Sequence, residues 1–78
     1  MPLSEQHETE LTIHHTKEKL ASCQQKWRTL NTLYENAVTQ SSRERLEEEL
    51  DLIEEFILLH KNSIKNFQAH LDSLRALQ

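Results

Sequence analysis

Five histidines give this chain of 78 residues its most versatile side chains, because a neutral imidazole binds metal ions and a protonated one carries charge. They are His7, His14, His15, His60 and His70. No two stand four residues apart, and no His-Glu-x-x-His motif occurs. If the chain folds back on itself, His14 comes near His70, and a carboxylate such as Asp72 would then complete a zinc-binding group. Solvated histidines are the commoner arrangement, and we predict neither a metal nor a cofactor.

Cys23 and His60 are the second pair with chemical potential, because a folded-back chain would place them in one layer. A thiol beside an imidazole can become a reactive thiolate. A seam between two helices offers no substrate cleft, however, and a polar layer that sets the helix register explains the pair better. We therefore predict no catalytic residue, no small-molecule substrate and no enzymatic activity.

The composition predicts helices, because the chain has no glycine and its single proline is Pro2. Strands and tight turns rely on glycine for positive φ, and phosphate-binding loops rely on it as well. The net charge of −4 argues against nucleic acids and anionic membranes as partners. The longest apolar run, residues 56–59, is far shorter than the roughly 20 residues that span a bilayer. With one cysteine and no leader-like start, the chain is expected to be cytoplasmic.

Two heptad patterns place these side chains on helices. The first repeats every seven residues in two sets, namely Ile13, Leu20, Trp27 and Tyr34, then Thr16, Cys23, Leu30 and Ala37. The second alternates steps of four and three through Leu46, Leu50, Ile53, Ile57, His60, Ile64, Phe67, Leu71 and Leu74. The phases of the two patterns differ by two residues, which one continuous helix cannot absorb without losing its seam. A turn between the patterns is the simpler explanation.

The turn is predicted at about residues 39–43, where polar residues gather. Ser41 followed by Glu44 matches a capping box, which marks the start of a helix. A turn centred between Ser41 and Ser42 fixes which residues of the two halves face each other. In this register apolar residues meet apolar residues in every layer.

The predicted fold is all-α: an antiparallel two-helix hairpin, similar to a coiled coil, completed by oligomerisation or by a partner helix. The first helix is expected over about residues 4–39 and the second over about 42–76, within one domain that covers residues 1–78. Ser4 is the expected cap of the first helix. Leu30 is expected to lie near Ile53.

A second apolar stripe runs along the second helix, beside its seam. Leu52, Phe56 and Leu59 are spaced by four and three residues, so they share a helical face. A helix that is apolar on two sides usually has two neighbours, and two helices pack along only one line. We predict that this stripe, together with Leu58 and Glu55, binds a helical protein partner or a second copy of the chain. The alternative is that the stripe broadens a single core and covers Trp27.

One segment resembles a known family. Residues 45–53 are similar to the second helix of small sporulation-type aspartyl-phosphate phosphatases, which are two-helix proteins with a Ser-Gln-Glu-Leu-Asp signature. Glu49 and Asp51 match this signature, Glu47 stands in place of its serine, and the family's glycine-containing turn is absent. In size and architecture the chain is also similar to the hairpin co-chaperones of type III secretion needle subunits, although no motif carries that likeness.

The sequence thus predicts a non-catalytic protein–protein interaction module, such as a small helical adaptor, assembly factor or co-chaperone. The alternative implied by the phosphatase resemblance is a small two-helix regulatory protein that acts on a phosphorylated response regulator. In that reading Asp51 would be the residue to test.

Overall fold

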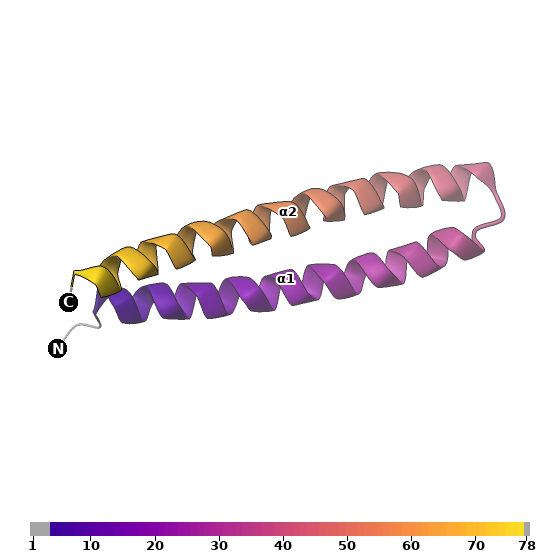
Figure 1. Cartoon of the computed structure of the whole chain (residues 1–78). Coiled ribbons are helices and arrows are strands. Elements are labelled where there is room, and N and C mark those ends of the chain that lie inside the picture. Colours follow the sequence, from indigo (N-terminus) through magenta and orange to yellow (C-terminus); the bar gives the residue numbers. More distant parts are fainter. Residues whose placement is uncertain (1–3, 78) are drawn as a thin grey trace.

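The computed structural model describes residues 4–77, which form two long helices and one short connection. Helix α1 spans Glu5–Asn36 and helix α2 spans Gln40–Ala76. The helices run antiparallel and lie side by side along their whole length (Figure 1). The molecule is a rod with extents of 59 × 19 × 14 Å. The predicted all-α antiparallel hairpin is confirmed.

Helix α1 begins where the sequence predicts it. The Ser4 side chain accepts a hydrogen bond from the backbone N–H of His7 at 3.1 Å, so Ser4 is the N-cap. Glu5 and Glu8 occupy the first turn, where the helix dipole favours negative charge.

The turn lies earlier in the chain than the prediction of 39–43. Helix α1 ends at Asn36, α2 begins at Gln40, and residues 37–39 connect them. The predicted cap at Ser41 is wrong, because the Thr39 hydroxyl accepts the hydrogen bond from the Ser42 N–H at 3.1 Å. Ala37 and Thr39 are extended, and no residue among 4–77 has positive φ, so this turn needs no glycine.

Contacts along the seam and beside the turn join the two helices. Leu30 packs with Leu50 and Ile53, and the Arg43 Nε donates to the Ala37 carbonyl oxygen at 3.1 Å. The Arg43–Ala37 bond is centred on residue 40, whereas the packing of Leu30 with Ile53 fits the predicted centre between residues 41 and 42. The expected proximity of Leu30 and Ile53 is therefore confirmed.

The hydrophobic core is thin. Its buried apolar residues are Ile13, Leu30, Leu50, Ile53 and Leu71, and no described side chain is less than 2% exposed. Thr9 and Thr16 are also buried, and their hydroxyls donate to carbonyl oxygens one turn earlier in the same helix. Exposed polar contacts link the open end: His70 Nε2 lies 3.1 Å from Glu5 Oε1, and Arg75 forms an ion pair with Glu10 at 3.3 Å. Such exposed pairs contribute little stability.

Candidate partner-binding surface

The second apolar stripe of α2 is exposed to solvent. Leu52 is 52% exposed, Phe56 42% and Leu59 56%. The alternative that these side chains form part of a single core over Trp27 is therefore wrong. Their role in binding a partner stays a prediction, but the side chains are accessible as that role requires.

The stripe borders a groove that both helices line. Lys26 and Leu30 of α1 and Glu49, Leu52 and Ile53 of α2 surround a shallow cavity of about 210 Å³. The stripe and Lys26 therefore lie on the same broad side of the hairpin.

Leu33 extends this apolar surface onto α1. It follows Lys26 by seven residues, so it occupies the same row of the helix. Leu33 is 52% exposed. We call the surface formed by Leu33, Leu52, Phe56 and Leu59 the Leu52 face.

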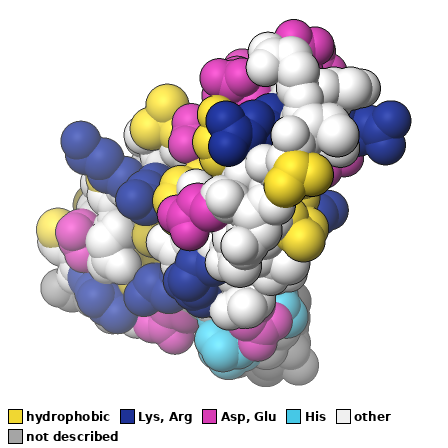
Figure 2. Space-filling view, turned by 90° about the vertical axis from the view of Figure 1, so that its right-hand side faces the viewer, with side chains coloured by type: hydrophobic (Ala, Val, Ile, Leu, Met, Phe, Trp, Pro, Cys, Tyr) yellow, Lys and Arg dark blue, Asp and Glu magenta, His cyan; other side chains and the backbone are white. Residues whose placement is uncertain are grey.

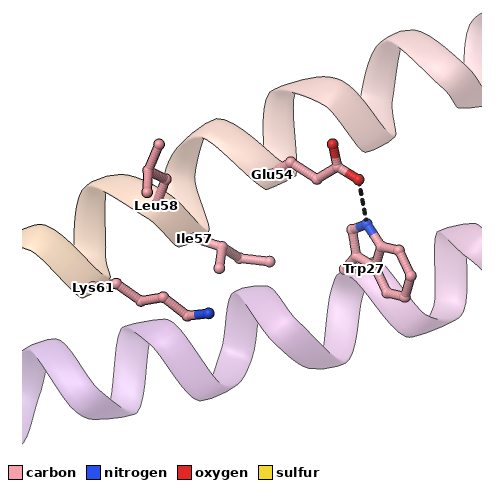
Figure 3. Close-up of a pocket in the computed structure, with 5 residues that line it drawn as sticks. All are labelled: Trp27, Glu54, Ile57, Leu58 and Lys61. Carbon is pink, nitrogen blue, oxygen red and sulfur yellow. Dashed lines mark hydrogen bonds between the residues drawn. The ribbon is translucent and has the colours of Figure 1, made fainter.

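The opposite broad side carries a different pocket, which we call the Trp27 pocket. It has a volume of about 330 Å³ and is lined by Trp27, Glu54, Ile57, Leu58 and Lys61. In Figure 3, Ile57 points toward Trp27, Leu58 points away from α1, and Lys61 reaches down toward it. The indole Nε1–H of Trp27 donates to Glu54 Oε1 at 3.1 Å (Figure 3). This hydrogen bond satisfies the polar atom of the only tryptophan.

The five residues predicted to bind a partner are therefore divided between surfaces. Leu52, Phe56 and Leu59 share the Leu52 face, whereas Leu58 lines the Trp27 pocket and is 60% exposed there. Glu55 and Leu58 also border a shallow depression that points away from α1. The heptad pattern already separates these two sides of α2. Leu52 comes just before the seam residue Ile53 and Leu58 just after the seam residue Ile57, so the two leucines lie on opposite sides of the seam.

Charged side chains of both signs surround the apolar surfaces. Seen from the end that carries the turn, hydrophobic side chains reach the surface in separate patches between Lys or Arg and Asp or Glu (Figure 2). On the groove beside the Leu52 face, Lys26 and Glu49 provide one charge of each sign. A partner for this surface needs an apolar centre and a rim of mixed charge.

Three of the five histidines lie beside carboxylates, and His14 and His15 share one of these, Glu18. His14 pairs with Glu18 at 2.9 Å, while His70 pairs with Glu5. The zinc-binding group considered from the sequence does not form: within residues 4–77 no three His, Cys, Asp or Glu side chains are placed to hold a metal ion.

Cys23 is half-buried against the core cluster of Leu30, Leu50 and Ile53. Ile57 of α2 packs against the same cluster. No hydrogen bond joins the Cys23 thiol to His60 in the described part of the chain. Packing against apolar neighbours accounts for Cys23 as a small hydrophobic residue.

Asp51, which matches the phosphatase signature, is exposed on α2. It borders the same shallow depression as Glu54, Glu55 and Leu58. Three carboxylates around one depression repel a phosphoryl group, which is itself negatively charged. The surroundings of Asp51 therefore do not resemble a phosphate-binding site.

The described residues define a two-helix hairpin with an accessible apolar face. Comparison of the chain with protein-family models, curated protein sequences and solved structures finds no match. Neither described helix contains a segment long and apolar enough to cross a membrane.

Proposed function

We propose that the protein is a non-catalytic interaction module that binds a helical partner or a second copy through the Leu52 face. One observation carries the proposal: three large apolar side chains at helical spacing, Leu52, Phe56 and Leu59, are 42–56% exposed. Among residues 4–77 only five apolar side chains are buried. Exposed apolar surface next to so thin a core is typical of a hairpin that is completed by another chain.

Within this class the protein acts as a small adaptor, assembly factor or co-chaperone in the cytoplasm. Its free thiol, Cys23, suits a reducing compartment. Its net charge of −4 does not suit a nucleic acid or an anionic lipid surface as the partner. A helix laid along the Leu52 face would meet apolar side chains at i, i+4 and i+7, which is the spacing that an amphipathic helix recognises.

The test is affinity capture from the native source with the wild-type chain, Phe56→Glu and Leu11→Glu, followed by mass spectrometry. Phe56 and Leu11 are almost equally exposed, at 42% and 40%, but Leu11 lies on α1 outside the Leu52 face. We expect the wild type and Leu11→Glu to retain the same protein and Phe56→Glu to lose it. Circular dichroism must show equal helix content in all three. Retention by Phe56→Glu at the wild-type level would refute the proposal.

The competing hypothesis is a phosphatase-like regulator that acts through Asp51. Asp51→Asn preserves the size of the side chain and removes its charge. If the protein is an interaction module, Asp51→Asn should leave capture unchanged, because Asp51 and the Leu52 face lie on different sides of α2. Loss of dephosphorylation of a phosphorylated response regulator in this variant, with the hairpin intact, would favour the phosphatase instead.

A further inference from the structure

The chain exposes more surface than a compact protein of its mass. Its accessible surface is 6083 Å². The scaling for compact monomers predicts about 5,000 Å² for a chain of 9.3 kDa. The excess is about 1,100 Å² per chain, and two copies that buried it would form an interface of about 2,200 Å², within the range of stable homodimers. The hairpin is one layer of helices, only 14 Å thick, whereas folded domains are built from two packed layers.

The apolar residues of the Leu52 face lie mostly on α2. The same side of α1 carries exposed polar residues, Lys19, Ser22 and Lys26, over most of its length. If α2 of one copy packed on α1 of another, the stripe would meet these polar side chains. Apolar contact therefore requires that α2 of one copy pack on α2 of the other.

The direction of this pairing follows from the position of the stripe and of the acidic residues. In a parallel pair each residue meets its own copy, so the exposed Glu48 and Glu49 would face like charges, which is destabilising. In an antiparallel pair with its two-fold axis at Phe56, Leu52 of one copy lies beside Leu59 of the other. Phe56 then lies beside its own copy on the axis.

We propose that the occupant of the Leu52 face is a second copy of this chain, packed antiparallel to form a four-helix bundle with its two-fold axis at Phe56. This inference rests on the proposed function, since it uses the same face and names its partner. Phe56 lies close to the middle of α2. A two-fold axis there brings Gln40 opposite Asp72, so α2 overlaps its copy over about 50 Å. In this arrangement Glu48 and Glu49 no longer face their own copies.

Disulfide cross-linking tests both the face and the direction. In a Cys23→Ser background, Glu49→Cys and Ser63→Cys are made as separate variants. Both positions are seven residues from Phe56, so they share its row on the helix and lie opposite each other in the antiparallel pair. Asp51→Cys and Lys61→Cys are the matched controls, because they are each five residues from Phe56 but lie on the opposite side of the hairpin.

We expect a mixture of Glu49→Cys and Ser63→Cys to form mixed disulfides several-fold faster than either variant forms a homodimeric disulfide. We expect no such enhancement for the control pair. Homodimeric disulfides from each variant alone would indicate a parallel pair and overturn the proposal. Equal cross-linking of the control pair would indicate non-specific collision and overturn it as well.

Sedimentation equilibrium at micromolar concentration supplies the independent measurement. The wild type is expected to sediment as a dimer and Phe56→Glu as a monomer with its helix content retained. If Phe56→Glu unfolds, Leu59→Gln at a more exposed position serves in its place. A monomeric wild type overturns the self-pairing. If the wild type is monomeric but Phe56→Glu loses capture of another protein, the proposed function stands and only the self-pairing fails. If the wild type is monomeric and Phe56→Glu captures as well as the wild type, both proposals fail.

Discussion

Replacing Leu50 with alanine should destabilise the hairpin far more than the same change at Leu52, two residues away. Leu50 is 8% exposed and packs in the core cluster, whereas Leu52 is 52% exposed. A buried leucine-to-alanine change costs about 2–5 kcal/mol. The neighbouring groove allows partial collapse around the vacated space, so we expect the lower part of this range, about 2–3 kcal/mol. Leu52→Ala should cost about 0.5 kcal/mol or less in the monomer.

The assay is urea unfolding followed by circular dichroism, with Trp27 fluorescence as a second probe. A domain of this length is stable by about 4–12 kcal/mol, so a loss of 2–3 kcal/mol moves the midpoint clearly. Measurement at low protein concentration keeps the contribution of self-association to Leu52→Ala small. Equal free energies of unfolding for the two variants would refute the assignment of the core to the Leu30–Leu50–Ile53 cluster.

Three further changes test local features of the hairpin. Thr39→Ala removes the side chain that caps α2 and should lower the free energy of unfolding by about 1 kcal/mol, whereas Ser41→Ala should leave it unchanged; thermal unfolding distinguishes them. Glu54→Gln replaces a charged acceptor of the Trp27 indole with a neutral one, and because Glu54 is exposed we expect a shift in tryptophan emission with a stability change below about 1 kcal/mol. Cys23→Ser should cost about 1 kcal/mol by placing a hydroxyl among apolar neighbours, and it should leave partner capture unchanged. Loss of capture in a folded Cys23→Ser protein would point to a role for the thiol.

The heptad patterns were sufficient to predict the two helices, because seam residues such as Leu50 and Ile53 must face another helix wherever the turn lies. They were not sufficient to place the turn. Ala37 is a good helix former, yet it ends α1, because propensities are weak beside the packing of the seams. The capping box at Ser41 is a local pattern, but Thr39 caps α2 instead, since its hydroxyl accepts from the N–H of Ser42 in the first turn of α2.

The apolar stripe was also predictable from the sequence. Our prediction nevertheless grouped Leu58 with the stripe, although Leu58 lies on the other broad side of the hairpin. Leu52 and Leu58 are both apolar neighbours of seam residues, and only their order relative to the seam separates the two broad sides of the hairpin. The bond from Trp27 to Glu54 depends on the exact register and on side-chain conformation, which the heptad patterns alone do not determine. The sequence contains no signal for the pair of His70 and Glu5 beyond their closeness to the two ends.

The three-residue connection determines the order in which the hairpin closes. Tyr34 and Leu46 both pack against the Leu30–Leu50–Ile53 cluster near the turn, so bringing them together closes the shortest loop between the cluster's residues on α1 and α2. Thr9 and Leu71, buried at the open end, are separated by about 60 residues of chain. Bringing these two regions together costs less chain entropy once the layers nearer the turn have formed. The helices therefore zip from the turn toward the termini, and thermal fluctuations open them in the reverse order. Backbone amides near Glu5 and Ala76 should exchange with solvent earliest, and those around Leu30 and Leu50 last.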